Sequence, residues 1–193
     1  VNAKVDFKDV SLSIFKNFPD ITLSLNNISV VGLGEFSKDT LASVSSFNVS
    51  INVMSYIKRS VIDVKTISIK DPYIHAIVLE NGKANWDIAK ANDKMEDDKV
   101  SEISDTTSSD FNLNLDKLEI LNGTVLYQDY STKMLTGLNK LNFGLKGNMS
   151  GDQTELDLKT SAENLIFMSD GMTYLSNLSF GMDTKVDADL KNM

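Results

Sequence analysis

Apolar and polar residues alternate with a period of two along most of the chain. Residues 47–53 are typical, because Phe, Val, Ile and Val alternate there with Asn, Ser and Asn. Residues 141–145 and 156–159 repeat the pattern. Side chains of a β-strand point alternately to its two faces, so the pattern predicts strands with one apolar and one polar face. Helical periodicity is scarce, and short helical turns are expected in three places, residues 37–44, 55–59 and 86–91.

A finer pattern occurs four times: two alternating apolar pairs separated by a phase slip of one residue. The copies are Val5, Phe7, Val10 and Leu12; Leu23, Leu25, Ile28 and Val30; Ile62, Val64, Ile67 and Ile69; and Leu113, Leu115, Leu118 and Ile120. A slip turns the second pair to the other face of a strand unless a bulge absorbs the extra residue. We therefore predict repeated bulges that curl a sheet around an apolar interior. The alternative is a chance recurrence among many strands.

The first pair of each copy supplies the candidate functional surface. We predict that these residues share one apolar face, which is either lipid-facing or core-facing. The eight residues are Val5, Phe7, Leu23, Leu25, Ile62, Val64, Leu113 and Leu115.

Breakers and a polar stretch divide the chain. Asp71-Pro72 separates two strand patterns, and Asn122-Gly123 is a strong hairpin signal. Residues 91–110 are rich in charged and hydroxyl side chains, too polar to offset their ordering entropy, so we predict a mobile loop. This gives an N-terminal β unit (1–90), an acidic mobile loop (91–110) and a second β unit of the same sheet (111–193), truncated at its C-terminus.

The amino-acid composition argues against several classes of function. The chain has 193 residues, 41% of them hydrophobic, which is enough for a sizeable core. A net charge of −8 argues against nucleic-acid binding and against simple electrostatic docking on anionic headgroups. The absence of Cys excludes disulfides and thiolate zinc sites. No apolar run reaches the length of about 18 residues that a membrane-spanning helix needs. Because strand patterns are interrupted at both ends, we expect a piece of a longer protein.

Candidate chemistry is sparse. His75 is the only His, and acid–base or metal chemistry needs positioned partners that the sequence does not supply. Asp183, Asp187 and Asp189 lack the Gly and Glu of a calcium loop and are typical of the polar face of a strand. We predict no catalytic residue, metal or cofactor. Trp86 follows the Asn81-Gly82 turn, and we expect it to be a buried anchor.

Several motifs resemble the N-terminal region of AsmA-family proteins. Phe18-Pro19 leads into a strand and the segment Asn27-Ile28-Ser29-Val30. Pro72 precedes a strand that is followed by Asn-Gly-Lys-Ala-Asn-Trp-Asp-Ile at residues 81–88, the most specific element. Asn122-Gly123-Thr124-Val125 is similar to a later family unit. The residues that carry these motifs are Pro19, Pro72, Gly82, Asn85, Trp86 and Gly123.

The resemblance implies a mainly β protein: a curved, twisted, mostly antiparallel sheet, groove-like or a partly open barrel, with one or two short helices. It also implies a bacterial envelope protein on the periplasmic side, anchored in the inner membrane by an upstream N-terminal helix. The implied function is non-enzymatic outer-membrane assembly through handling or transfer of lipid along an apolar groove. Partners would be phospholipid or another envelope lipid, or envelope proteins. The alternative is a structural or adhesive domain that binds proteins through sheet edges. A glycosidase with paired carboxylates has little support, because the sequence pairs none.

Overall fold

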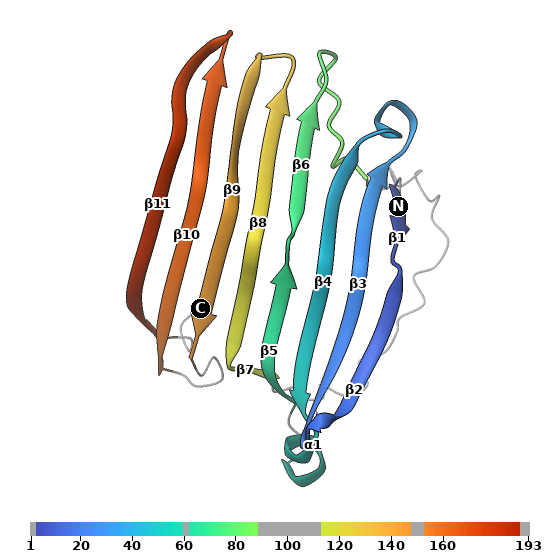
Figure 1. Ribbon diagram of the computed structural model, residues 1–193, viewed down its shortest axis with the longest axis vertical. Coiled ribbons are helices and arrows are strands. Elements are labelled where there is room, and N and C mark those ends of the chain that lie inside the picture. The colour runs from blue at the N-terminus through green and yellow to red at the C-terminus, as the bar shows by residue number, and fades with distance from the viewer. Residues whose placement is uncertain (1–2, 60–61, 89–112, 148–152, 190–193) are drawn as a thin grey trace, which may run out of the picture.

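The described part of the chain forms one mixed β-sheet of eleven strands in a single layer (Figure 1). The computed structural model describes residues 3–59, 62–88, 113–147 and 153–189. The strands are β1 (Ala3–Asp6), β2 (Asp9–Asn17), β3 (Asp20–Gly32), β4 (Thr40–Asn52), β5 (Ile62–Lys70), β6 (Tyr73–Val78), β7 (Leu113–Leu115), β8 (Lys117–Asp129), β9 (Met134–Lys146), β10 (Gln153–Ser169) and β11 (Met172–Asp189). The prediction of a mainly β, mostly antiparallel, open sheet with very little helix is confirmed.

We call each position across the sheet a strand line, and three of these lines are each formed by two consecutive strands. β1 and β2 both pair with β3, β5 and β6 both pair with β4, and β7 and β8 both pair with β5. The order across the sheet is therefore β1/β2, β3, β4, β5/β6, β7/β8, β9, β10, β11. Neighbouring lines run antiparallel except at β5/β6 against β7/β8, where the pairing is parallel. Strands from both predicted β units thus join one sheet, while the division into units stays a prediction.

Within the described residues, helix is confined to two short segments. α1 (Val53–Arg59) includes the turn expected at 55–59, and a 3₁₀ turn spans Gly34–Phe36. The helical turn expected at 37–44 is wrong, because β4 begins at Thr40 and its pairing with β3 outweighs local preference. Residues 86–88 are not helical either. The predicted mobile loop, 91–110, lies outside the described residues.

The expected hairpin at Asn122-Gly123 is also wrong. β8 runs straight through these residues, and Gly123 lies opposite Leu141 of β9. Asn122 alone adopts a left-handed conformation, with φ of 56°. A two-residue hairpin of this kind needs positive φ at both central residues, so a single left-handed Asn produces a bulge instead.

Very little of the described chain is enclosed. The buried apolar side chains in the described ranges are Phe36, Val64, Ile77 and Ala162, and only the small Ala162 is almost completely enclosed, at 1% exposure. A single layer can cover a side chain only with its neighbours in the same sheet. Most strand residues are accordingly half-buried, and the core is a thin band instead of a closed interior.

Candidate functional site: the apolar face of the sheet

One face of the sheet is lined by apolar side chains across its whole width. Directly opposed residues in paired strands lie on the same face. One row of opposed residues runs Val10, Leu25, Phe47, Ile69, Ile120, Phe143, Thr160 and Met182. The next row runs Leu12, Leu23, Val49, Ile67, Leu118, Leu145, Leu158 and Thr184. We call the side defined by these rows the apolar face.

The opposite side, which we call the polar face, carries the residues between them. Its corresponding row is Ser11, Ser24, Asn48, Ser68, Glu119, Gly144, Lys159 and Asp183. The hydroxyls of Thr22 and Ser50 are hydrogen-bonded across β3 and β4 at 3.0 Å. Lys159 Nζ donates to Asp183 Oδ2 at 2.7 Å. Polar side chains on the polar face thus bond to one another, whereas the two apolar rows contain only two polar side chains, Thr160 and Thr184.

The structure places most of the eight candidate residues on the apolar face. Leu23 and Leu25 belong to the rows above, and Val5 lies opposite Val30. Val64 lies between Ile51 of β4 and Leu115 of β7. Ile62 shares that face because it precedes Val64 by two residues in β5. Phe7 lies at the break between β1 and β2 and is exposed, and the backbone of Leu113 lies opposite Ile62.

A transverse line of left-handed residues keeps the apolar set on one face. We call it the left-handed row: Asn27 (β3), Asp71 (between β5 and β6), Asn122 (β8), Lys140 (β9), Asn164 (β10) and Asn177 (β11), all with φ between 47° and 56°. The register of β8–β9, β9–β10 and β10–β11 shifts at these positions. Asn122, Lys140, Asn164 and Asn177 lie where these shifts occur, whereas the register between β3 and β4 does not shift at Asn27. Five of the six are Asn or Asp, the non-glycine residues that tolerate this conformation best.

Polar contacts tie the left-handed row together. The Asn122 side-chain amide donates to Asp71 Oδ1 at 2.7 Å, and the Asn122 backbone N–H donates to Asn142 Oδ1 at 3.0 Å. Lys140 Nζ donates to Glu163 Oε2 at 2.7 Å. These contacts fix the alignment of the slips in four successive lines of the sheet.

A second slip lies nearer the α1 end of the sheet. The β4–β5 register shifts at Lys65, and Asp116 separates β7 from β8. Lys65 Nζ donates to Asp116 Oδ2 at 2.9 Å, and this hydrogen bond raises the pKa of Lys65. Lys65 and Asp116, which lie at the phase slips of two copies of the repeated pattern, therefore form an ion pair with each other. The bulge predicted for the Ile62 copy is confirmed. The bulge predicted for the Leu23 copy is not found, because the register between β3 and β4 does not shift at Asn27, although Asn27 is left-handed.

The 81–88 motif is anchored by Asn85, and the prediction of a buried Trp86 is wrong. Asn85 is 2% exposed, and its side chain accepts from the Ile77 N–H at 2.9 Å and donates to the His75 carbonyl at 2.7 Å. The amide thus completes the hydrogen bonding of β6 where β4 no longer pairs with it. Trp86 is 42% exposed and rests against Tyr127, with ring centroids 6.1 Å apart. A one-layered sheet cannot enclose an indole, whereas a small amide fits into its ladder.

The remaining motif residues shape the backbone. Gly82 takes φ of 79° in the turn before Asn85, a conformation that favours glycine. A Cβ at Gly123 would lie 3.2 Å from Cγ of Pro72 and 3.3 Å from Cβ of Leu141. The carbonyl of Pro19 accepts the Val53 N–H at 3.1 Å, at the start of α1. These residues hold the sheet together and carry no chemistry of their own.

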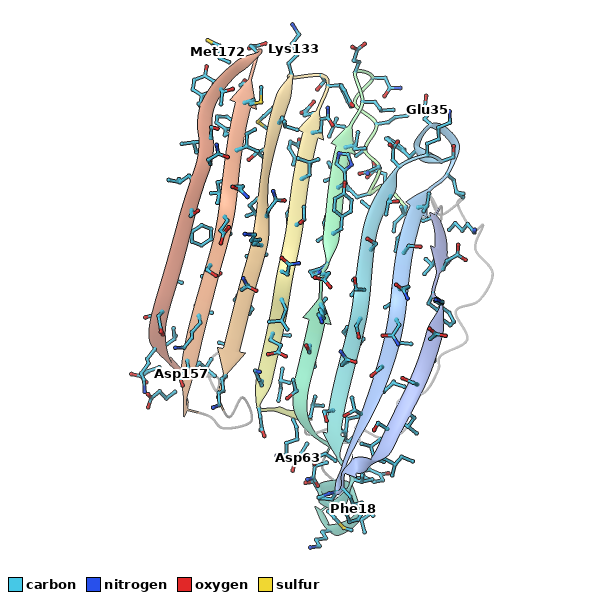
Figure 2. The ribbon with its side chains drawn as sticks, viewed as in Figure 1. Phe18, Glu35, Asp63, Lys133, Asp157 and Met172 are labelled. Carbon is cyan, nitrogen blue, oxygen red and sulfur yellow. The ribbon has the colours of Figure 1, made fainter. Side chains whose placement is uncertain are left out.

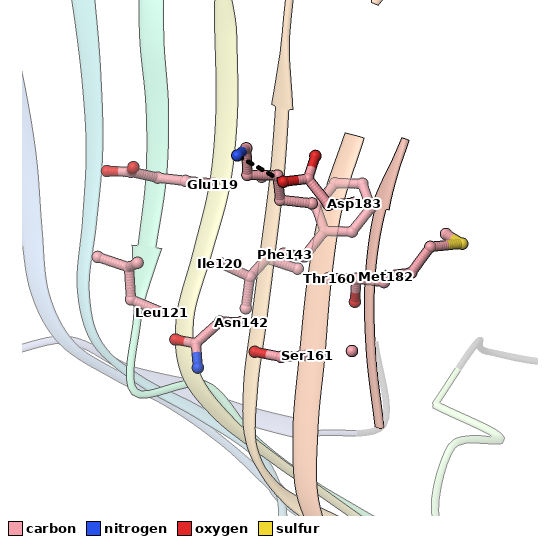
Figure 3. A pocket seen from close by; sticks show the side chains of 12 residues that line it. Glu119, Ile120, Leu121, Asn142, Phe143, Thr160, Ser161, Met182 and Asp183 are labelled. Atoms are coloured by element: carbon pink, nitrogen blue, oxygen red, sulfur yellow. Dashed lines mark hydrogen bonds and ion pairs between the residues drawn. The ribbon is translucent and has the colours of Figure 1, made fainter. Parts of the chain in front are cut away.

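A shallow hollow of about 520 Å³ spans β8 to β11, lined by residues of both faces (Figure 3). Lys159 and Asp183 are among its lining residues, and the ion pair described above joins them; Figure 3 labels Asp183. Glu119 forms an ion pair with Lys117, and that hydrogen bond lowers the pKa of Glu119. These charges already have partners.

Residues suited to catalysis or metal binding are dispersed. Across 3–59, 62–88, 113–147 and 153–189, no three His, Asp or Glu side chains gather closely enough to hold a metal ion. His75 lies edge-on to Tyr73, with ring centroids 6.2 Å apart. No helix in the same ranges combines the length and apolarity needed to cross a bilayer.

The fold and this site define a class: an open, one-layered β-sheet that is apolar on one side and polar on the other. A family model described as the AsmA family matches residues 7–184. The chain belongs to the AsmA family, and the resemblance carried by the Pro72 and 81–88 motifs is confirmed. Membership is consistent with a role in the cell envelope. No curated protein matches the chain.

Proposed function

We propose that this chain handles lipid in the bacterial cell envelope by holding acyl chains against its apolar face. One observation carries the proposal: apolar side chains line one side of every strand line, and nothing in the described part of the chain forms a second layer over them (Figure 2). An apolar sheet face must be covered by another layer, by closure or by a ligand. In this proposal the function is binding and transfer, not catalysis.

The dimensions and energetics suit lipid. Eight strand lines spaced about 4.8 Å apart give the face a width of roughly 35 Å, longer than an acyl chain. Each methylene removed from water contributes about 0.8 kcal/mol, so an apolar wall suffices without a specific polar contact. An apolar area this large exceeds what soluble monomers usually leave in water. We further propose phospholipid or another envelope lipid as the ligand, and a periplasmic location with an upstream anchor in the inner membrane.

Photocrosslinking with matched positions on the two faces tests the proposal. A photoreactive residue replaces Leu25, Val64 or Leu115 on the apolar face, and Ser24 or Ser68 on the polar face, in the full-length protein in cells. Lipid adducts are expected at the first set and not at the second, because adjacent strand residues point to opposite sides. Absence of adducts at all apolar positions, or equal adducts on both faces, would contradict lipid handling.

A second candidate function has one observation in its favour. β11 spans 18 residues, and within the described ranges it pairs only with β10. Exposed Tyr174, Leu178 and Phe180 lie along it. A protein partner that adds a strand to this edge would bind by main-chain hydrogen bonds. Protein adducts from position 174 together with an absence of lipid adducts from position 25 would favour this function.

A further inference from the structure

An apolar tip protrudes from the sheet end formed by the β2–β3 turn and α1. Figure 1 shows α1 beyond the strand ends, and Figure 2 labels Phe18 beside it. Ile57 is 69% exposed and Phe18 66%, the two highest values among large apolar side chains in the described chain. Tyr56 is also exposed. We call Phe18, Tyr56 and Ile57 the apolar tip.

The apolar tip stands on a built platform. The side-chain oxygen of Asn52 accepts the Ser55 N–H at 3.1 Å, the bond of a helix N-cap. The Asn52 side-chain amide donates to Asp20 Oδ1 at 2.7 Å, which ties the cap to β3. The Val53 N–H donates to the Pro19 carbonyl at 3.1 Å, so the turn that carries Phe18 is bonded to the helix that carries Ile57. The exposed side chains are therefore held in place by specific bonds.

The helix that carries Tyr56 and Ile57 is basic in sequence, whereas the whole chain is acidic. α1 has the sequence Val-Met-Ser-Tyr-Ile-Lys-Arg, with two cations and no acid, in a chain of net charge −8. Lys58 is exposed beside Ile57. Asp20 is the acid nearest to Phe18 in the sequence, and its carboxylate is turned toward the Asn52 amide, to which it is hydrogen-bonded. The tip thus combines apolar and aromatic side chains with local positive charge.

We propose that the apolar tip inserts into the interface of an anionic lipid bilayer. Aromatic and aliphatic side chains flanked by Lys and Arg are typical of segments that lie in the headgroup region. A convex tip of three side chains is far smaller than the roughly 800 Å² per partner of a stable protein interface. Insertion into lipid needs no such area and no shape complementarity. The proposal does not depend on lipid binding by the apolar face, which lies on a different part of the molecule.

A site-specific fluorophore tests the insertion, and the lack of Cys in the chain makes labelling unambiguous. Ile57→Cys carries an environment-sensitive label such as NBD. Met172→Cys is the matched control, because Met172 is 58% exposed and lies at the opposite end of the sheet (Figure 2). The probes are vesicles of phosphatidylethanolamine with phosphatidylglycerol, and vesicles of phosphatidylcholine alone.

Insertion predicts a blue shift and a several-fold rise in NBD emission at position 57 with anionic vesicles, and little change at position 172. Lys58→Glu should weaken vesicle binding by about tenfold, and salt should weaken it in the unchanged protein. Phe18→Ser combined with Tyr56→Ser should abolish the emission rise while circular dichroism still reports a folded sheet. No rise at position 57 would overturn the proposal. So would an equal rise at position 172, which indicates adsorption through the apolar face, or a rise with protein concentration alone, which indicates self-association.

Discussion

The two faces of the sheet use the same strands and opposite chemistry. Leu25 and Ser24 are adjacent in β3 and both half-buried, yet one joins a row of apolar side chains and the other a row of hydroxyls, amides and charges. Burial alone does not distinguish the faces, because a single layer shields both to the same degree. The difference lies in what each face still requires. The polar face is satisfied by its own hydrogen bonds and by water, whereas the apolar face gains free energy only when something apolar covers it.

The largest expected difference between the two faces is in the stability lost when a carboxylate is introduced on each. Val64 is 5% exposed on the apolar face, so Val64→Asp should lower the free energy of unfolding by about 3 kcal/mol or more. Thr66 lies two residues along β5 and faces the other way, opposite Ser50. Thr66→Asp should cost less than about 1 kcal/mol. Urea denaturation measures both. Equal losses would show that the faces do not differ in their tolerance of charge.

Asn85 and Trp86 are neighbours in the sequence but differ in their surroundings. The Asn85 amide is buried and hydrogen-bonded to β6, whereas the Trp86 ring is exposed. Asn85→Ala leaves the Ile77 N–H and the His75 carbonyl without partners, which should cost about 2 to 3 kcal/mol. Trp86→Ala removes an exposed ring that rests on Tyr127, and should cost about 1 kcal/mol. Thermal unfolding of the two variants gives the order. A larger loss for Trp86→Ala would restore the buried-anchor hypothesis.

The sequence alone predicts the faces well and the alignment of strands poorly. Alternation is local, so the pattern around Leu25 assigns its face without knowledge of any neighbour. The phase slip at Lys65 also reveals a bulge. The sequence does not show that slips on different strands meet, because register depends on residues far apart in the chain. The bond between Asn122 and Asp71, and that between Lys65 and Asp116, each join residues 51 positions apart.

Errors at single motifs have the same origin. Asn122-Gly123 is a hairpin signal when judged locally, but β9 pairs with both halves of β8 and keeps the chain straight. Trp86 is the largest side chain of its motif and therefore the expected anchor. The structure instead uses Asn85, because the open position beside β6 requires a donor and an acceptor. No local signal marks that position. Asn85 could be proposed as an anchor only by considering that an amide side chain can bond to a strand that lacks a neighbouring strand.

The left-handed row offers a test of how the apolar face is kept continuous. Asn122→Gly keeps the left-handed conformation at little backbone cost, whereas Asn122→Val disfavours it by about 1 to 2 kcal/mol. Both variants lose the hydrogen bond to Asp71, so their difference isolates the backbone conformation. Chemical denaturation should find the Val variant less stable than the Gly variant. Equal stability would show that the slip does not depend on the left-handed residue.

Substitution of Asp129 has the smallest expected effect on stability. It refines the comparison of the two faces, because Asp129 is a carboxylate on the apolar side. It lies opposite Met134 and contacts the Tyr127 hydroxyl, two residues before it on the same face. Unlike an Asp at position 64, it is supplied with donors: Ser131 Oγ at 2.6 Å, the Ser131 N–H at 2.8 Å and the Thr132 N–H at 3.1 Å. The hydrogen bond from the Ser131 hydroxyl is the main reason why the pKa of Asp129 falls from 3.8 to about 2.

The lowered pKa of Asp129 determines how its contribution to stability changes with pH. Asp129 contributes its full stabilisation above pH 3.8, and the contribution is lost as pH falls from there through about 2. Asp129→Asn should therefore be less stable than the unchanged protein at neutral pH, and the gap should narrow below pH 3.8. Ser131→Ala should raise the pKa of Asp129 and move the loss to higher pH. Urea midpoints measured from pH 2 to 7 decide the matter. A gap that is independent of pH would show that the carboxylate is not held by these donors, and that a charge on the apolar face needs no local donors.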